Sequence, residues 1–174
     1  MSAHQAVDRQ TDTAAHPPAW RSDRVLDWVG TAVRAALVVV WAWAGLAKIS
    51  DPEAAAQAVR VYRLLPESLV KPVGYGLPFL ELAIALLLLV VLGTRITAFL
   101  SAVLLMVYMG GIASVWARGI AINCGCFGGG GAVAASQTQY WQDLLRDTGF
   151  LLLSAWLLWR PASKLSLDRW LAAD

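Results

Sequence analysis

The chain has 174 residues, of which 58% are hydrophobic and only 15% are charged, well below the roughly 25% charged residues of a typical soluble domain. Together with a mean hydropathy of +0.56, this composition excludes an ordinary soluble protein and predicts an all-α, polytopic membrane protein whose main partner is the lipid bilayer. The formal charge of +2, without a basic stripe of interleaved aromatic residues, argues against nucleic-acid binding.

Residues 1–24 are polar and carry only isolated apolar side chains. Because such a segment buries too little surface to offset the entropy lost on ordering, we expect a disordered tail. A cleavable signal peptide is not expected, since the apolar run that follows is too long and lacks a cleavage site of small residues. With a second short tail at 161–174, the membrane domain should cover residues 25–160.

Four apolar segments approach the roughly 20 residues that a helix needs to cross a bilayer. They lie at about 29–47, 72–92, 96–116 and 141–159. The last is the weakest, because Asp143, Arg146 and Asp147 crowd its first two turns, but its second half is purely apolar. Tryptophans near the segment ends support the count, although nine tryptophans would place some there by chance. The sequence therefore predicts a four-transmembrane-helix bundle.

Residues 51–65, between the first two spans, predict a short helix of a different kind. Asp51 can cap its start, Pro52 suits its first turn, and Pro66 ends it. Apolar and charged side chains fall on opposite faces. The segment is either an amphipathic helix on the membrane surface or an ordinary connector packed on the bundle.

The chain has only two cysteines, Cys124 and Cys126, separated by Gly125 in a loop after the third span. Glycine permits the bent backbone of a small disulfide ring, and strained rings tend to be oxidising and exchangeable. The pair is therefore a candidate redox site, and the alternative is two inert thiols in a loop.

Other chemistry at this loop is less well supported by the sequence. A closed zinc site needs four ligands, but the only histidines, His4 and His16, lie in the predicted tail, so no metal is expected. The glycines at 128–131 lack the Lys and Ser/Thr of a phosphate-binding loop and are interpreted as a flexible linker.

Four motifs occur in a fixed order along the chain: "GLAKISDP" (45–52), "VYRLLP" (61–66), "LPFLELAIALLLL" (77–89) and "NCGCFG" (123–128). In these motifs, from about Val29 to Trp159, the chain resembles the MauE family of methylamine-utilisation membrane proteins, which is related to DoxX. Gly125, Phe127 and Gly128 belong to the most specific motif. The resemblance implies a four-helix protein that supports disulfide formation outside the cytoplasm, with a thioredoxin-like or disulfide-containing partner. The N-terminal extension and the "GGGGAVAAS" loop depart from the family pattern.

Among the charged residues inside the predicted spans, Arg34, Glu81 and Arg146 are functional hypotheses, because a charge in the bilayer must be paired or hydrated. With a rise of about 1.5 Å per helical residue, Glu81 and Arg146 lie at similar depths in the bilayer. We therefore predict an ion pair between them. The pair either locks the bundle or lets Arg146 lower a thiol pKa or orient a quinone carbonyl. Lys48 either snorkels to the interface or joins this cluster.

Two functions of different classes follow from these residues. In the first, a thiol–disulfide oxidoreductase of the cell (inner) membrane passes electrons between Cys124 and Cys126 and a partner protein or a membrane quinone. Basic residues near the span ends divide six to five between the two sides of the membrane, which does not decide the orientation. Because disulfide chemistry favours an oxidising compartment, we expect the cysteine loop outside the cytoplasm and both termini inside it. In the second, a non-catalytic assembly or accessory subunit docks a partner complex. A small transporter or lipid-binding bundle would rest only on Arg34 and Glu81.

Overall fold

The computed structural model describes residues 19–90 and 93–160, with side chains from residue 25 onward. The elements in chain order are α2 (Ala19–Ile49), α3 (Pro52–Val61), α4 (Glu67–Val90), α5 (Thr94–Ala117), β1 (Ile122–Asn123), β2 (Gly131–Ala132), the 3-10 turn η1 (Ala135–Gln137) and α6 (Tyr140–Trp159). The prediction of a helical protein is confirmed. Helix α2 starts inside the segment predicted as the N-terminal tail, and residues 1–18 and the predicted tail 161–174 lie outside the described residues.

Within the described residues, three helices are long and apolar enough to cross a membrane. They are the Val25–Ile49 part of α2, all of α4 and all of α5. Helix α6 forms over the fourth predicted segment and has 20 residues, but it is not among these three. The fourth span therefore stays a prediction.

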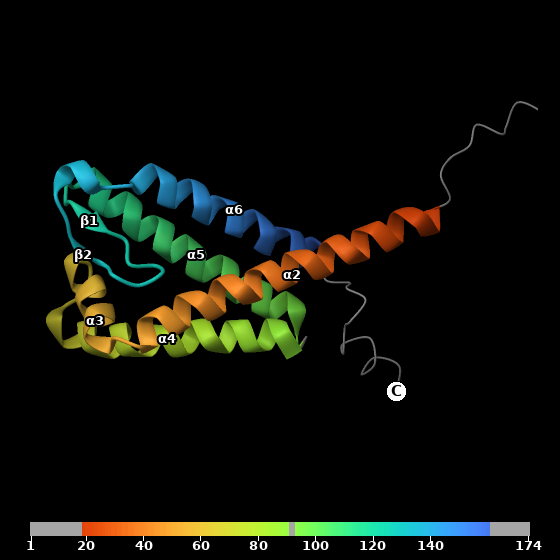
Figure 1. Cartoon of the computed structure of the whole chain (residues 1–174), viewed down its shortest axis with the longest axis horizontal. Coiled ribbons are helices and arrows are strands. Elements are labelled where there is room, and N and C mark those ends of the chain that lie inside the picture. The colour runs from red at the N-terminus through yellow and green to blue at the C-terminus, as the bar shows by residue number, and fades with distance from the viewer. Residues whose placement is uncertain (1–18, 91–92, 161–174) are drawn as a thin grey trace, which may run out of the picture.

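The long helices lie lengthwise beside one another, α2 along α4 and α5 along α6 (Figure 1). Helices α4 and α5 are close at the end where one follows the other in sequence and separate toward the opposite end. Helix α3 and the β1–β2 segment occupy that wider end (Figure 1). The strands pair antiparallel, Ile122 with Ala132 and Asn123 with Gly131. This wider end is where the candidate site lies.

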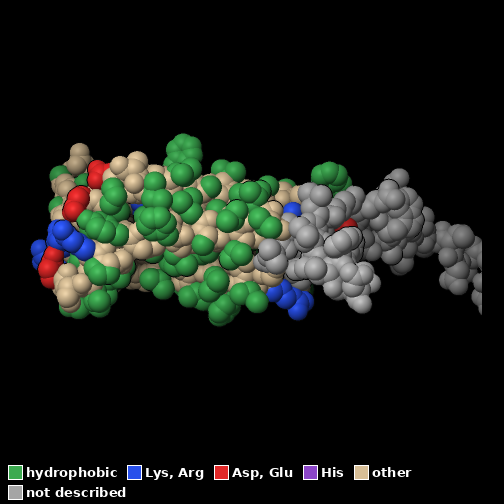
Figure 2. Space-filling model, turned by 90° about the horizontal axis from the view of Figure 1, so that it is seen from below, with side chains coloured by type: hydrophobic (Ala, Val, Ile, Leu, Met, Phe, Trp, Pro, Cys, Tyr) green, Lys and Arg blue, Asp and Glu red, His purple; other side chains and the backbone are tan. Residues whose placement is uncertain are grey.

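An apolar core joins the four long helices. Leu37 of α2, Leu88 of α4, Leu105 of α5 and Leu157 of α6 are all buried in it. Large apolar side chains also cover the outside of the helices, whereas acidic and basic side chains gather at the wider end and further basic ones lie at the opposite end (Figure 2). A soluble protein keeps such apolar surface small, so this distribution is that of a membrane protein.

Helix α3 begins as predicted. The Asp51 carboxylate accepts a hydrogen bond from the Ala54 N–H at 3.0 Å, and Pro52 occupies the first turn. The helix ends at Val61, earlier than the predicted 65, because the chain turns at Arg63, whose φ is +52°. Its small residues pack on α4 so closely that a Cβ on Gly74 would come within 2.5 Å of the Ala56 Cα. Its position at a membrane surface stays a prediction.

Candidate functional site

The loop after α5 folds back into the wider end of the bundle. Tyr140, at the start of α6, accepts a hydrogen bond from the Ile122 N–H at 2.9 Å and donates one to the Ile120 carbonyl. This anchors β1 and directs the following residues inward. As a result Cys124 and Cys126 are each only 8% exposed. The sequence predicted the loop but not this burial.

Two glycines allow the inward turn. Gly125 has φ +69°, a left-handed conformation that side chains disfavour. A Cβ there would come within 2.7 Å of the Gly130 Cα, and a Cβ on Gly130 would come within 2.6 Å of the Ala58 side chain. The interpretation of residues 128–131 as a flexible linker is therefore wrong at Gly130, because this residue packs between the cysteine turn and α3.

The two cysteines are free thiols in the structure and differ in character. A hydrogen bond from the Cys126 side chain lowers the pKa of Cys124, and the Cys126 N–H, 3.4 Å from the Cys124 sulfur, adds to this effect. The same side-chain hydrogen bond, together with burial, raises the pKa of Cys126 well above its usual value. Cys124 is therefore the sulfur that more readily forms the thiolate, the nucleophilic form of a cysteine.

Arg146 of α6 lies beside this pair. Its guanidinium is 3.9 Å from the Cys124 sulfur and 4.8 Å from the centre of the Phe127 ring. It forms ion pairs with Asp143 at 3.1 Å and Asp147 at 3.0 Å. The predicted Glu81–Arg146 pair is therefore wrong, whereas the predicted proximity of Arg146 to a cysteine agrees with the structure.

Glu81 instead pairs with Lys48. Its carboxylate is fully buried, accepts a hydrogen bond from the Lys48 ammonium at 2.6 Å, and accepts another from the Tyr108 hydroxyl. Lys48 also donates to the Cys126 carbonyl at 2.6 Å. The depth count missed this pair because depth along a helix does not say which helices are neighbours. Lys48 thus joins the site and ties the cysteine turn to the bundle.

The other intramembrane charge lies elsewhere. Arg34 is buried on α2, 14 residues and roughly 21 Å along the helix from Lys48. Sequence reasoning also missed two tyrosines. Tyr108 holds Glu81, and the Tyr62 hydroxyl donates to the Cys124 carbonyl at 3.0 Å. Burial raises the pKa of Tyr62, so it stays a neutral donor. Tyr62 lies in the "VYRLLP" motif, which could have indicated it.

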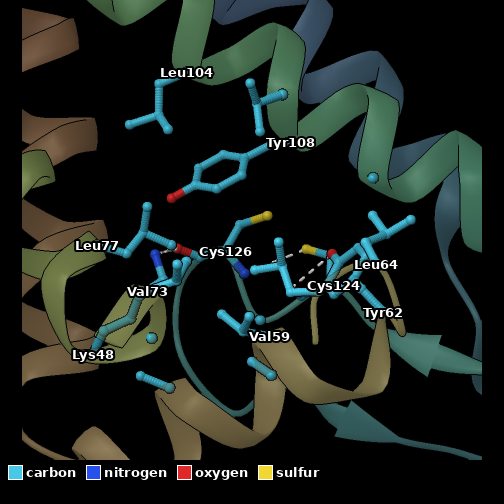
Figure 3. Close-up of a pocket in the computed structure, with 17 residues that line it drawn as sticks. Lys48, Val59, Tyr62, Leu64, Val73, Leu77, Leu104, Tyr108, Cys124 and Cys126 are labelled. Atoms are coloured by element: carbon cyan, nitrogen blue, oxygen red, sulfur yellow. Dashed lines mark hydrogen bonds between the residues drawn. The ribbon is translucent and has the colours of Figure 1, made fainter. Parts of the chain in front are cut away.

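These groups surround a cavity of about 230 Å³ between α3, α4, α5 and the cysteine turn. Around the two cysteines, Tyr108 projects from α5, Val59 from α3, Leu77 from α4 and Lys48 from the end of α2 (Figure 3). Most of the wall is apolar. The site therefore combines a thiol of lowered pKa, a second thiol of raised pKa and a buried cation next to an apolar cavity.

Comparisons with known proteins identify the family of the chain. The family model described as methylamine utilisation protein MauE matches residues 26–160. A curated relative, the methylamine utilization protein MauE of Methylorubrum extorquens, is 36% identical over 132 residues, which cover 75% of this chain and 69% of the relative. No solved structure matches the chain significantly.

Proposed function

The chain belongs to the MauE family of methylamine utilisation proteins, and on that premise we propose that it is a membrane thiol–disulfide redox protein. The observation that carries the proposal is the environment of the Cys124 sulfur, which has the Cys126 N–H at 3.4 Å and the Arg146 guanidinium at 3.9 Å. These contacts add to the hydrogen bond from the Cys126 side chain in lowering the pKa of Cys124, whereas the same hydrogen bond and burial raise the pKa of Cys126. Such a difference suits exchange, because one sulfur then leaves readily as thiolate while the other stays protonated.

The reaction balances between two cysteine pairs. In the oxidised protein, a thiolate of an extracytoplasmic partner attacks Cys126, the Cys124–Cys126 bond breaks, and Cys124 leaves as the more stable thiolate. The second partner thiol, deprotonated in turn, then attacks the mixed disulfide, which releases Cys126. The partner loses two electrons and gains a disulfide, and this protein returns to its dithiol form. We propose a thioredoxin-like or disulfide-containing partner.

Serine variants test this role. Cys124→Ser and Cys126→Ser should each abolish disulfide exchange without lowering the amount of protein in the membrane. With Cys126→Ser, the Cys124 thiolate should attack the disulfide of an oxidised partner and stay joined to one of its sulfurs while the other leaves as thiolate, because this protein then has no second thiol to release it. If both variants keep function, or lose it only in proportion to abundance, the alternative of a non-catalytic assembly subunit holds instead.

A redox titration of the purified protein, followed by thiol alkylation, adds an independent test. A ring that spans a single residue is strained, so the pair should have a midpoint above about −300 mV, outside the range of inert structural disulfides. A lower midpoint, or a pair that never oxidises, contradicts the redox role.

We further propose that α6 is a fourth span, that α3 lies at the membrane surface, and that the cysteine turn is extracytoplasmic with both termini cytoplasmic. Leu145 and Leu152 on the outer face of α6 are each 66% exposed, as lipid-facing residues would be. An oxidising compartment also suits a reversible disulfide.

Two exposed positions test the orientation. In a variant without native cysteines, Gln137→Cys near the cysteine turn should react with an impermeant maleimide in intact cells. Arg95→Cys, at the opposite end of the bundle, should react only after permeabilisation. The reverse pattern would show that the orientation is wrong.

A further inference from the structure

We propose that the cavity beside the cysteines binds the ring of a lipid-soluble quinone, which reoxidises Cys124 and Cys126. This inference rests on the proposed redox function and adds the class of its electron acceptor. A dithiol that is returned to its disulfide must pass two electrons to some acceptor, and the shape, lining and opening of the cavity identify which class can reach the sulfurs.

The opening of the cavity is apolar. Among its lining residues, those with more than a third of their surface exposed are Leu64, Leu65, Val73 and Val107. Val73 lies on α4 and Val107 on α5, both of which are candidate membrane spans. The mouth therefore opens between two helices onto the apolar outer surface, where lipid would lie. A water-soluble acceptor has no reason to enter by this route, whereas a molecule dissolved in the bilayer reaches it by lateral diffusion.

The size of the cavity suits one ring. Its volume of about 230 Å³ exceeds that of the roughly 150 Å³ apolar cavity known to bind benzene. It is too small to enclose a complete lipid or a folded peptide segment. A substituted six-membered ring fits inside, and an attached hydrocarbon tail would pass out between Val73 and Val107. The tail would then remain in the bilayer.

The polar groups of the cavity lie at its inner end, with the sulfurs. Cys124, Cys126, Lys48 and Tyr108 all line it, and Figure 3 shows them around the same space. Lys48 donates short hydrogen bonds to Glu81 and Cys126, but its third contact, to the Ala44 carbonyl, is 3.5 Å long. That weak contact leaves one N–H of the ammonium able to turn to a ring carbonyl.

The electron balance is simple. Two S–H bonds break and one S–S bond forms, so the pair gives up two electrons and two protons. The quinone takes up both and becomes the quinol. Negative charge develops on a quinone oxygen as electrons arrive, and the Lys48 ammonium stabilises it within a site of low dielectric constant. Glu81 and Tyr108 keep that ammonium in place.

The test uses the purified full-length protein in detergent, reduced and then freed of reductant. Decylubiquinone should oxidise both thiols, with one quinol formed per disulfide. In Val107→Trp the indole should obstruct the mouth and slow this reaction about tenfold or more. Met106→Trp is the matched control, because Met106 is the exposed neighbour on α5 and does not line the cavity. Val73→Trp obstructs the opposite rim independently.

The soluble oxidant diamide separates the two proposals. All variants should react with diamide at the wild-type rate and melt at the wild-type temperature. A pair that diamide oxidises but decylubiquinone does not overturns the quinone inference and leaves the redox function standing. If Val107→Trp and Val73→Trp both react with decylubiquinone at the wild-type rate, the quinone inference is also overturned. That result is expected if the cavity holds a lipid acyl chain instead. A pair that neither reagent oxidises refutes the redox function itself.

Discussion

The two halves of the helix bundle bury polar groups in different ways. Away from the cysteines, the Trp41 indole donates to Ser101 at 2.8 Å, and Ser101 bonds Ser154 of α6 at 2.9 Å. These neutral groups satisfy one another between three helices. In the half that holds the cysteines, two buried groups of opposite charge, Lys48 and Glu81, form an ion pair, and Lys48 also bonds the loop backbone. Buried charge is not confined to this half, since Arg34 is buried on α2 away from Lys48.

This difference indicates where the candidate site lies. A neutral hydroxyl contact holds helices together at little desolvation cost, as the Trp41–Ser101–Ser154 chain does. An ion pair in the same environment costs far more to bury, and packing alone does not require one. Charges within membrane-spanning helices are therefore candidates for chemistry, and Lys48 and Glu81 lie beside two thiols and a cavity. The following variants test that contrast.

The largest effect is expected from Glu81→Leu. It leaves the buried Lys48 ammonium without its carboxylate, a loss of about 3–5 kcal/mol of stability. Ser101→Ala in the other half should cost only about 1 kcal/mol. Glu81→Gln should lie between them, because the amide oxygen still accepts from Lys48 and Tyr108. Denaturant unfolding in detergent, followed by circular dichroism, measures all three. If Glu81→Leu costs no more than Ser101→Ala, the charged half is not held by its ion pair.

A smaller effect is expected at the glycines of the cysteine turn. Gly125 and Gly129 both have φ +69°, but a Cβ on Gly129 would meet nothing within 4 Å. Gly129→Ala should therefore cost about 1–2 kcal/mol from backbone strain alone. Gly125→Ala adds the contact with Gly130, roughly 1–3 kcal/mol more, and should also expose the thiols to alkylation. Gly125→Val should be worse still. Denaturant unfolding measures the loss of stability in each variant. Equal losses for Gly125→Ala and Gly129→Ala would show that the cysteine turn is not tightly packed.

The sequence predicted what depends on local signals. Apolar length indicated α2, α4 and α5, and the Asp51–Pro52 pair indicated the start of α3. The cysteines were identified by composition and motif. Contacts between helices were not predictable in this way: a depth count paired Glu81 with Arg146, because it could not show that α2 lies along α4. The packing of Gly130 against Ala58 is equally long-range, so the glycine run looked like a linker.

The smallest effect is expected from the outermost charge of the site, Arg146. Its guanidinium lowers the pKa of Cys124, but less than the hydrogen bond from Cys126 does. Arg146→Gln should therefore raise the pKa of Cys124, so that less thiolate is present at neutral pH and iodoacetamide reacts roughly two- to fivefold more slowly. The difference should vanish at alkaline pH, where the thiol is ionised in both proteins.

Two further variants give a strong and a null effect with which the alkylation rate of Arg146→Gln can be compared. Cys126→Ala removes the strongest cause of the lowered Cys124 pKa and should slow alkylation of Cys124 more than Arg146→Gln does. Arg95→Gln removes a charge at the opposite end of the bundle and should change nothing. Peptide mass spectrometry assigns the alkylated cysteine in each case. If Arg146→Gln alkylates at the wild-type rate across the pH range, the guanidinium only anchors Asp143 and Asp147, and the acidity of Cys124 comes from the cysteine turn itself.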